Sequence, residues 1–439
     1  MITRKKPLKH QWPSFLKFKY LVLALRLHKL LRNNTSSQCV AGAVFFISFL
    51  FFITFPCQAK EIPEISQYIS KGGYALNKNG KTVFSKNLKD VFIPASTIKL
   101  LTSLAAIEIL GSDYHFHTRI YFDKRSKTLY IKGSGDPYLV SEKVYEITKS
   151  IAAKGIMTIQ DIVLDDSAFA LEHTKTLGAD DSNNPYNANC SALAVNFNTL
   201  PLKVLHKAKI KSPERQTPYL PIMGQIGKGL TSGYHRVNID AFLQNSSLSN
   251  SLLYCGQLFK AFLLQQGIKV TGTIKQGHVP PVTPLLHHYI AKESVSDLVQ
   301  SCLLSSSNFM ANQLFLAVGI KQYGFPATWK KSQKAMSDFI HNFLGLTDNQ
   351  ISVVEGSGLS KENMISPEAM IQVLAKFKPY AALVPIKYGV RMKSGTLRKS
   401  GVFCYAGYIT KGKIQNPFVI FLNQKRNNRD IVLKFLYKQ

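Results

Sequence analysis

The sequence predicts a mixed α/β protein with helix and sheet at both ends of the chain and a β-rich middle. Three observations lead to this fold class. A hairpin signal followed by an apolar helix occupies residues 72–110. Short strand-like runs separated by Gly, Pro and Asn fill residues 117–284. Helical blocks and a second hairpin follow at residues 294–437.

The first elements are predicted by a turn and by helix-end signals. Residues 72–84 have the pattern of two short strands joined at Asn79–Gly80, a dipeptide typical of tight hairpins. Pro94 precedes an apolar run that begins at Ser96 and stops before Gly111, as expected of a helix.

The later elements are predicted in the same way, from the spacing of apolar residues and from the Gly, Pro and Asn residues that end each run. Strands are expected at residues 118–123, 128–133, 161–166 and 268–274, helices at 294–321, 327–344 and 367–377, a hairpin at 402–423 with its turn at 411–413, and a closing helix at 429–437.

Composition indicates a folded and very basic protein. Of the 439 residues 45% are hydrophobic and 18% charged, which excludes a disordered chain. The formal net charge is +30, and residues 1–38 hold nine Lys or Arg and no acid. Such charge favours nucleic acid, anionic lipid or a carboxylate-rich polymer, or is simply a solvated surface. No nucleic-acid-binding motif is present, so nucleic acid is not an expected partner.

The first 59 residues have the parts of an export signal. A basic region precedes the apolar run 40–56, and Cys57 and Ala59 supply small residues before a cut. Cleavage after Ala59 is favoured, and a retained anchor stays open. In both cases the residues after 60 lie outside the cytoplasm, in the periplasm. The basic region also fits association with the inner-membrane surface.

Cysteine usage gives no metal motif. Cys39 and Cys57 belong to the signal region, and the other cysteines are widely spaced without a Cys-x-x-Cys pair. Buried free thiols are expected, and zinc is not. These cysteines are Cys190, Cys255, Cys302 and Cys404.

Ser96 and Lys99 form the first chemical motif, Ser-x-x-Lys at a predicted helix start. Residues three apart share one helix face and can touch, and the helix N-terminus favours a developing negative charge. A partly desolvated lysine can then act as the base that activates the serine. The other Ser-x-x-Lys, Ser14–Lys17, lies in the basic N-terminal region and is set aside.

The second motif is Lys393–Ser394–Gly395–Thr396, just ahead of the terminal hairpin. Lys393 offers a positive charge for a substrate carboxylate, and Gly395 permits close approach of a ligand backbone. The peptide N–H groups of Thr396 and Ser96 are candidate oxyanion donors.

The third motif is Ser306–Ser307–Asn308, ahead of a predicted helix. Ser306 can relay a proton to a leaving amine, and Asn308 can hydrogen-bond a substrate amide. Helix capping by Ser306 or Ser307 is compatible with both roles. Another Ser-x-Asn, at 182–184, lies in a loop-like stretch.

Together, Ser-x-x-Lys, Ser-x-Asn and Lys-x-Gly in this order are the motifs of active-site serine D,D-peptidases and serine β-lactamases. From Lys99 to Ser306 is 207 positions, more than a β-lactamase core needs. The chain resembles the class C low-molecular-mass penicillin-binding proteins, the D-alanyl-D-alanine carboxypeptidase/endopeptidase family. The resemblance also covers FIPASTIKLLTSLAAIEILG, IKGSGDPYL, IVLDDSAF, GIKVTGTI, GSGLSKENMISP and MKSGTL.

The resemblance implies a transpeptidase/β-lactamase-like catalytic domain with a five-stranded antiparallel sheet flanked by helices. Residues 60–116 and 285–439 would form it, and residues 117–284 would form a β-rich insert beside the cleft. It further implies D,D-carboxypeptidase and endopeptidase activity on peptidoglycan stem peptides, covalent inhibition by β-lactams, and no metal or organic cofactor.

Residue by residue, the resemblance makes Ser96 the acylated nucleophile and Lys99 its general base. Ser306 and Asn308 complete the proton relay and the binding of the substrate amide.

The remaining matched positions concern substrate recognition. Lys393 and Thr396 would bind the terminal D-Ala carboxylate. Asp165, Phe169 and Lys361 would help to recognise the diamino acid at the third position of the stem peptide.

The chain departs from the family pattern at a few places. Ser394 replaces the usual Thr but keeps a hydroxyl, and Glu355 stands where Asp normally precedes GSGLS. Lys361 replaces the commoner Arg and loses a bidentate fork. Arg398 stands where a neutral side chain is usual and adds affinity for carboxylate. These departures bear on substrate preference more than on activity.

Other hypotheses remain. A β-lactamase would need a dedicated deacylation residue and a shorter first gap. A catalytically silent peptidoglycan-binding or scaffold protein would keep the fold without the chemistry. A membrane or nucleic-acid binder would rest on the charge alone.

Overall fold

The computed structural model describes residues 59–439 except 174, 207–208, 243–246 and 413. The apolar run 40–56, the basic region before it, the first Ser-x-x-Lys motif and Lys413 of the predicted turn lie outside the described residues. Within the described part, no helix has the length and apolar character needed to cross a membrane.

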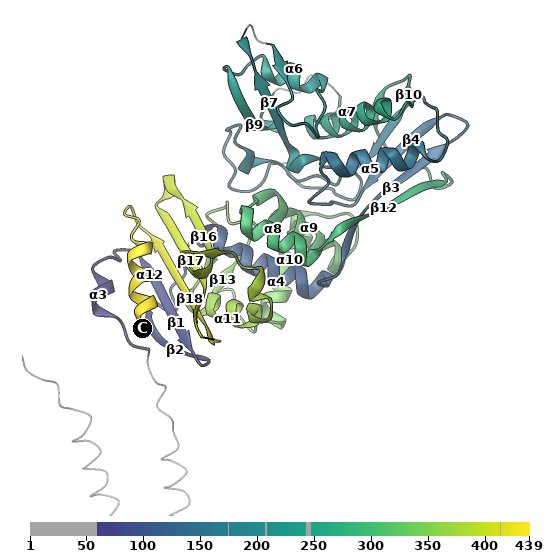
Figure 1. Ribbon diagram of the computed structural model, residues 1–439. Coiled ribbons are helices and arrows are strands. Elements are labelled where there is room, and N and C mark those ends of the chain that lie inside the picture. The colour runs from purple at the N-terminus through teal and green to yellow at the C-terminus, as the bar shows by residue number, and fades with distance from the viewer. Residues whose placement is uncertain (1–58, 174, 207–208, 243–246, 413) are drawn as a thin grey trace, which may run out of the picture. The chain divides into compact units, whose positions relative to one another are not determined.

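A six-stranded antiparallel sheet joins the two ends of the chain (Figure 1). Strand β1 near the start pairs with β18 near the end, so that Tyr74 lies opposite Ile420. Both predicted hairpins are confirmed. The resemblance implied five strands, and the sixth, β15, is a two-residue edge strand. Across the sheet the order is β15 (Ile386–Lys387), β16 (Val390–Leu397), β17 (Val402–Lys411), β18 (Ile414–Asn423), β1 (Gly72–Lys78) and β2 (Lys81–Lys86).

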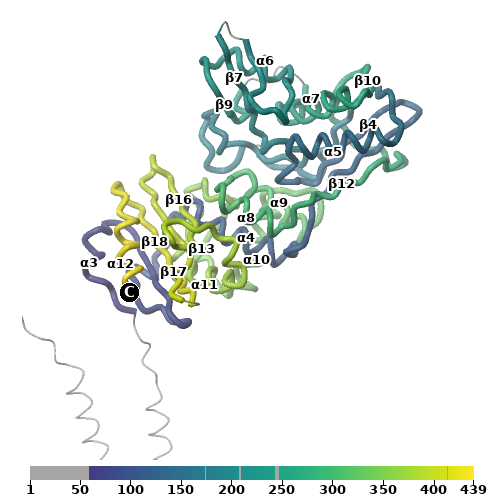
Figure 2. Tube along the Cα trace, viewed as in Figure 1, coloured from purple at the N-terminus to yellow at the C-terminus, as the bar shows by residue number. Residues whose placement is uncertain are grey.

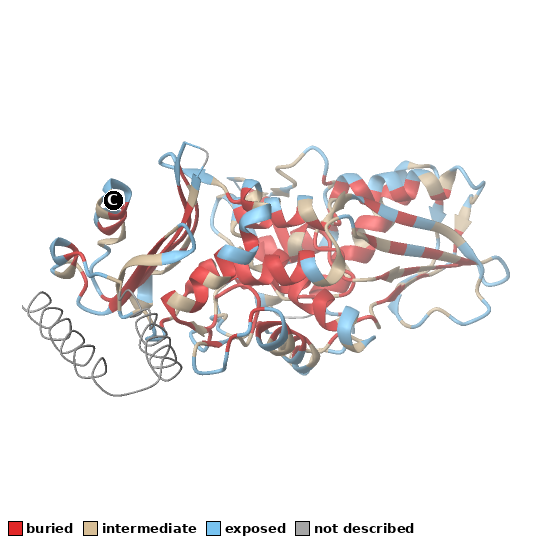
Figure 3. Cartoon of the chain, turned by 90° about the horizontal axis from the view of Figure 1, so that it is seen from below, coloured by how far each residue is buried: buried red, intermediate tan, exposed pale blue. Residues whose placement is uncertain are grey.

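Successive side chains of a strand point to opposite faces of a sheet, and the central strands here are apolar at both sets of positions. Both faces of this sheet are therefore apolar. On β17, Phe403 and Tyr405 belong to a core shared with α3 (Pro63–Ser66) and α12 (Arg429–Lys438). Cys404 and Ala406, between and beyond them, belong to the main helical core. Figure 3 shows buried residues along these strands and through the helices beside them.

The helices of the main core position two of the three motifs. After a 3-10 turn, η1 (Ala95–Ile98), helix α4 (Lys99–Leu110) ends at Gly111 with a φ of 101°. Helix α4 packs against α8, α9 and α11. The block predicted at 294–321 is two helices, because Ser306 between them is left-handed. The remaining elements here are α8 (Val295–Ser305), α9 (Asn308–Tyr323), α10 (Trp329–Asn342), α11 (Pro367–Phe377), η6 (Lys378–Leu383), η7 (Arg398–Ser400), β13 (Ile351–Ser352) and β14 (Met364–Ile365).

The middle of the chain builds a second sheet of five strands, in the order β11-β6-β4-β3-β12. Figure 2 traces the chain out along β3 and back along β12, which pair antiparallel. The predicted boundary at 116/117 falls inside β3, and that at 284/285 immediately precedes β12. The strands are β3 (His115–Asp123), β4 (Thr128–Gly133), β6 (Ile162–Asp165), β11 (Ile274–Gln276) and β12 (Leu285–Ser294), with the small pair β5 (Thr158–Ile159) and β10 (Lys269–Val270).

The expectation of a β-rich middle is incomplete, because the described residues of this region also form three helices. Val144, Ile147 and Ile151 recur at helical period and form the buried side of α5. The short strand-like runs on both sides of α5 make the region read as β-structure, so this helical spacing is not noticed in the sequence. The helices are α5 (Ser141–Ala152), α6 (Pro221–Gly227) and α7 (Asn250–Gln265), with 3-10 turns η2 (Pro185–Asn187), η3 (Asn196–Asn198) and η5 (Ile239–Ala241).

A third, three-stranded sheet extends the middle region, in the order β8-β7-β9. Helix α6 packs on it through Gly227, whose neighbour across the contact is Ile210. Its strands are β7 (Thr199–Val204), β8 (Ile210–Lys211) and β9 (Gly233–Asn238).

The expectation of free thiols is confirmed. Cys190, Cys255, Cys302 and Cys404 are all buried and unpaired.

Candidate active site

Ser96 and Lys99 lie together where η1 meets α4. Lys99 Nζ donates a hydrogen bond of 3.0 Å to Ser96 Oγ, so the contact predicted from their spacing is present. Ala95 before them has a φ of 46°, a conformation that non-glycine residues adopt at some cost. Gly358 allows this turn, since a Cβ there would lie 2.0 Å from the carbonyl oxygen of Ala95.

Lys99 is fully buried and has three hydrogen-bond partners. Besides Ser96, its Nζ donates to Oδ1 of Asn308 at 2.7 Å and to the carbonyl oxygen of Ser357 at 2.6 Å. Burial lowers the pKa of Lys99 to about 8, and the influence of Cys302 and then Glu355 opposes that shift. A lysine in this environment can exchange a proton near neutral pH.

The Ser-x-Asn motif spans the break between α8 and α9. Ser306 ends α8 with a φ of 58°, and Ser307 caps α9 by accepting from the N–H of Met310 at 3.2 Å. Asn308 is the first residue of α9, and its Nδ2 donates to the carbonyl oxygen of Tyr186 at 3.0 Å. This contact brings the middle region of the chain to Lys99 and Ser96.

The Lys-x-Gly motif lies on β16. Lys393 is 2% exposed, and its Nζ donates to Ser306 Oγ at 2.8 Å. Burial and then the charge of Lys99 lower the pKa of Lys393 to about 7. Gly395 allows β16 to approach η1, because a Cβ there would lie 2.6 Å from the oxygen of Pro94 and 3.0 Å from the nitrogen of Ser96.

The edge of β16 is open beside this motif. Within the described residues β15 pairs with β16 only at Val390 and Arg391, so the segment 393–396 has a strand neighbour on the β17 side alone. An open strand edge can accept an extended peptide. This edge lies where a peptide carbonyl can reach Ser96.

Arg429 on α12 fixes this strand from behind, a role that no motif indicated. Its Nη1 donates to the carbonyl oxygen of Gly395 at 2.9 Å and to Thr396 Oγ1 at 2.8 Å. Its guanidinium lies 4.4 Å from the ring centroid of Tyr405. The only sequence signal is a basic residue at the start of a terminal helix, which is too common to be specific.

Glu355 organises the loop that supplies the Ser357 carbonyl. The carboxylate is fully buried and accepts five hydrogen bonds from within its own loop. The donors are the N–H groups of Ser357 (2.8 Å), Gly358 (2.7 Å) and Ser360 (3.2 Å), the hydroxyl of Ser357 (2.6 Å) and Nδ2 of Asn363 (2.6 Å). The segment GSGLS was the available sequence signal, although it did not show that a backbone carbonyl reaches Lys99.

These elements surround a cavity of about 690 Å³. Among its lining residues are six that the sequence analysis singled out: Ser96, Ser306, Asn308, Lys361, Thr396 and Arg398. Lys99 and Lys393 are not among the residues that line the cavity. Lys99 is hydrogen-bonded to Ser96, and Lys393 is hydrogen-bonded to Ser306.

Three cationic residues and one acidic residue line the cavity. Lys361, Arg398 and Lys399 line it, together with Asp180 and Tyr186 from the middle of the chain. Asp180 lies 3.9 Å from Lys399. Hydrogen bonds from Ser182 and Asn187 lower the pKa of Asp180 to about 2. Asp180 carries no motif, and only the fold brings it here.

Asp165 and Phe169 do not line this cavity. Asp165 is fully buried, and its oxygens accept from Lys132 at 3.1 Å and from the N–H of Val279 at 2.9 Å. Phe169 packs over Gly135 and lines a separate cavity of about 390 Å³. The carboxylate of Asp165 is therefore occupied by protein partners instead of facing a ligand near Ser96.

Over the described ranges, no three His, Cys, Asp or Glu side chains are grouped to hold a metal ion. The reactive groups of the site are hydroxyls, amines and an amide.

Comparison with known proteins identifies the family. The model of the D-Ala-D-Ala carboxypeptidase 3 (S13) family matches residues 63–224 and 240–384. A D-alanyl-D-alanine carboxypeptidase of Actinomadura sp. (strain R39) is 23% identical over 347 residues, which are 68% of this chain and 62% of that protein. D-alanyl-D-alanine carboxypeptidase DacB of Haemophilus influenzae is 24% identical over 355 residues, 72% of each chain.

Solved structures show the same fold. Penicillin-binding protein 4 (dacB) of H. influenzae superimposes with a TM-score of 0.69 at 22% identity, over 86% of this chain and 97% of that one. The peptidoglycan endopeptidase Bd3459 of Bdellovibrio bacteriovorus gives a TM-score of 0.51 at 15% identity, over 84% and 91%. With most of its length matched by the family model and its fold shared with penicillin-binding protein 4, the chain belongs to the D-Ala-D-Ala carboxypeptidase 3 (S13) family.

Proposed function

We propose that the chain is a serine D,D-carboxypeptidase and D,D-endopeptidase that hydrolyses peptidoglycan stem peptides through an acyl-enzyme at Ser96. Family membership supports this proposal, as do relatives named D-alanyl-D-alanine carboxypeptidase. Structural neighbours include a peptidoglycan endopeptidase and a penicillin-binding protein complexed with a β-lactam. The second of these supports β-lactam binding here, and an acyl-enzyme at Ser96 would make that inhibition covalent.

The hydrogen bonding of Lys99 is the observation that carries the proposal. Two of its three partners are oxygens that can only accept, on Asn308 and Ser357. The third, Ser96 Oγ, can donate as well as accept. A neutral amine would therefore keep all three contacts, giving two protons to Asn308 and Ser357 and turning its lone pair toward the Ser96 hydroxyl.

Acylation follows from this arrangement. The Ser96 hydroxyl proton passes to Lys99 Nζ as Oγ bonds to the carbonyl carbon of the penultimate D-Ala. The carbonyl oxygen becomes an oxyanion facing the N–H groups of Ser96 and Thr396. When the intermediate collapses, the C–N bond breaks and the proton held by Lys99 passes through Ser306 to the leaving amine, which returns Lys99 to its neutral form.

Lys393 and its neighbours would hold the substrate for this step. A terminal carboxylate near Lys393 and Thr396 would counter the burial that lowers the lysine pKa, so Lys393 becomes charged as the substrate binds. Ser394 and Gly395 complete the strand edge. Asn308 would hold the substrate amide.

Hydrolysis of the ester completes the cycle. Water adds to the acyl carbon, its proton passes to Lys99, and Ser96 Oγ leaves with a proton returned to it. With free pentapeptide the first product is D-Ala, and with a crosslink it is the second stem peptide.

The outer cavity would recognise the rest of the stem peptide. Lys361 and Arg398 line it and would bind carboxylates. Asp165 and Phe169, assigned to the third-position residue by resemblance, lie outside this cavity, so we base recognition on the two cations.

We place this activity in the periplasm. The support is the export pattern of residues 1–59 and the cell-wall carboxypeptidases of the same family. Cleavage after Ala59 would release the protein, and a retained segment would keep it at the inner membrane.

The test is labelling of the full-length chain with fluorescent penicillin, followed by intact mass. We expect one adduct per chain, lost in Ser96→Ala and kept in Ser14→Ala, which removes the serine of the other Ser-x-x-Lys. Release of D-Ala from pentapeptide and cleavage of crosslinked dimers then distinguish the two activities. Rapid turnover of penicillin would indicate a β-lactamase, and a folded chain without adduct would indicate a silent binding protein.

A further inference from the structure

A row of cations lies on one face of the three-stranded sheet β8-β7-β9. Residues directly opposite in antiparallel strands point to the same face. Lys203 on β7 lies opposite Lys211 on β8 and opposite Tyr234 on β9. Arg236, two residues along β9 from Tyr234, shares that face.

The opposite face of this sheet is apolar and covered. Leu200, Leu202 and Val204 are buried and belong to the main core with Ile222 and Met223 of α6. The apolar face of the sheet therefore stabilises the fold, and on the other face Arg236 is held by Thr199 and Glu214 while Lys203 and Lys211 have no acidic partner among the described residues.

The lysine pair is unfavourable for folding. Like charges directly opposite each other destabilise a sheet. Lys203 Nζ contacts the Tyr234 hydroxyl at 2.7 Å and lies 4.1 Å from the ring centroid, so its neighbour is an aromatic ring. Tyr234 is 70% exposed. The hydrogen bond from Lys203, and then the charges of Lys203 and Lys211, lower the pKa of Tyr234.

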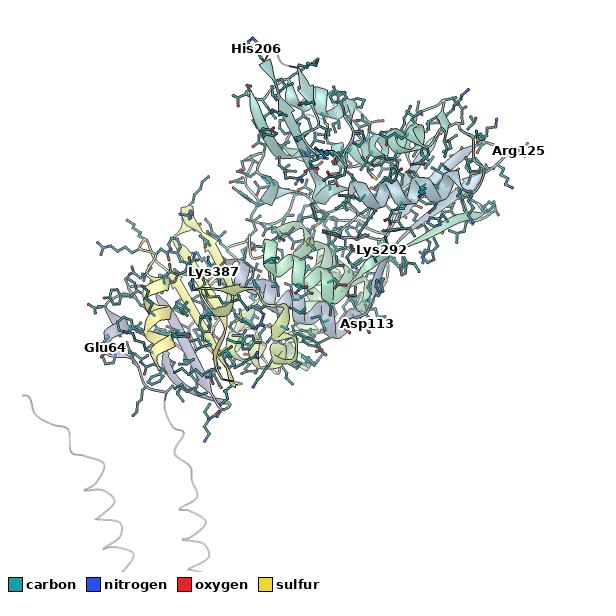
Figure 4. All side chains as sticks on the ribbon, viewed as in Figure 1. Glu64, Asp113, Arg125, His206, Lys292 and Lys387 are labelled. Atoms are coloured by element: carbon teal, nitrogen blue, oxygen red, sulfur yellow. The ribbon has the colours of Figure 1, made fainter. Side chains whose placement is uncertain are left out.

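The segment that carries these three strands is poor in acidic residues. Residues 199–238 contain seven Lys or Arg and a single acid, Glu214. Glu214 is paired with Arg236, so it does not offset the two lysines. Figure 4 labels His206 at the outer end of this region.

We propose that Lys203, Lys211 and Tyr234 form a second binding surface, separate from the catalytic cavity, for the carboxylate-bearing peptidoglycan polymer. This inference rests on the proposed function, which supplies the polymer. The two ammonium groups match closely spaced carboxylates, and the exposed ring offers a stacking face for a sugar.

A hydrated polymer fits this surface better than a lipid bilayer. Surfaces that insert into membranes pair cations with large apolar side chains. Here the row itself has one tyrosine and no exposed aliphatic residue. The surface would hold the polymer while stem peptides reach Ser96.

The test is co-sedimentation of the full-length chain with insoluble peptidoglycan after acylation by penicillin, so that the catalytic cavity is blocked. We expect the Lys203→Gln/Lys211→Gln variant to bind about tenfold more weakly, the effect of two exposed charge contacts. The difference should shrink from about 50 mM to about 300 mM salt, because screening increases. The wild-type chain should bind peptidoglycan with amidated carboxyl groups about tenfold more weakly than it binds unmodified peptidoglycan.

The matched control is Lys275→Gln/Lys292→Gln, which removes two exposed strand lysines that are each paired with an acid. It should bind like the wild type. If the Lys203→Gln/Lys211→Gln variant bound peptidoglycan as tightly as the wild type, the inference would be overturned. It would also be overturned if this variant lost binding to anionic phospholipid vesicles and kept its binding to peptidoglycan. Because every sample is acylated first, a chain that labels but does not sediment contradicts this surface alone. A chain that does not label contradicts the proposed function.

Discussion

The amine of Lys99 should set the pH at which Ser96 reacts. A lysine acts as a base only when neutral, and its pKa lies at about 8. At saturating penicillin, where the bound carboxylate keeps Lys393 charged, the rate of acylation should therefore rise with pH, level off above about 8, and be roughly a hundredfold lower two pH units below it. Stopped-flow labelling between pH 6 and 9 measures this. Lys99→Arg should lose about 10²-fold or more at every pH, and a flat wild-type profile would argue against Lys99 as the base.

Glu355 should tune that pH profile. Its negative charge favours the charged form of Lys99, so Glu355→Gln should move the acid limb of the profile to lower pH. Glu355→Asp keeps the charge and should leave the limb near its wild-type position. Glu362→Gln makes the same charge change at an exposed position of the same loop and should have no effect.

The direction of the shift distinguishes an electrostatic role from loss of the loop. If Glu355→Gln opened the loop, water would reach Lys99 and its pKa would rise toward the ordinary value. An upward shift, or none, would contradict a tuning role for Glu355.

The sequence predicted which motif residues lie close together, and it gave no signal for residues that only tertiary packing brings to the cavity. Ser96 and Lys99 are three positions apart, so helix geometry alone brings them together. Ser357 contributes a backbone carbonyl, which any residue type could supply. Asp180 and Arg429 reach the site by tertiary packing across long sequence separations. Asp165 has the expected residue type, but Lys132 and Val279 occupy its carboxylate.

At the scale of the elements, the contact between β16 and η1 depends on Gly395. A Cβ at this position would lie 2.6 Å from the oxygen of Pro94. Gly395→Ala should push the strand from Ser96, slowing acylation strongly while costing about 1–3 kcal/mol of stability. Gly229→Ala, where the nearest atom is 3.9 Å away, is the matched control. Penicillin labelling and thermal unfolding report the two effects separately, and normal labelling of Gly395→Ala would show that the contact is dispensable.

Elements with strong local signals were predicted well. The Asn79–Gly80 hairpin and the helix at 367–377 have sharp ends, supplied by a turn dipeptide and a proline. Helices α5 and α7 were missed because they lie among short strands. The strand-like composition of this region hides the helical spacing of their apolar residues. Ser306 separates α8 from α9 because its backbone is left-handed. The neighbouring residues contain no signal for this conformation.

At the scale of the whole molecule, the described cysteines should be inert. All four are buried, and burial raises their pKa values, that of Cys255 and of Cys404 to about 12. In a Cys39→Ser/Cys57→Ser variant, a thiol reagent should modify no group until the chain is unfolded and then modify four. Rapid modification of the native protein, or a melting temperature that falls with reductant, would contradict this.

The pairing of β1 with β18 has a consequence for the order in which the protein is made. Two paired strands of the sheet beside the site, β1 and β18, are far apart in the sequence, with Gly72 opposite Leu422. Contacts of such sequence separation form late, because a long loop must close first. A ribosome that has released β1 must complete almost the whole chain before its partner exists, whereas the middle sheet is contiguous and can fold earlier. The chemistry proposed for Ser96 would therefore be absent throughout synthesis and would arise only once β18 has been made.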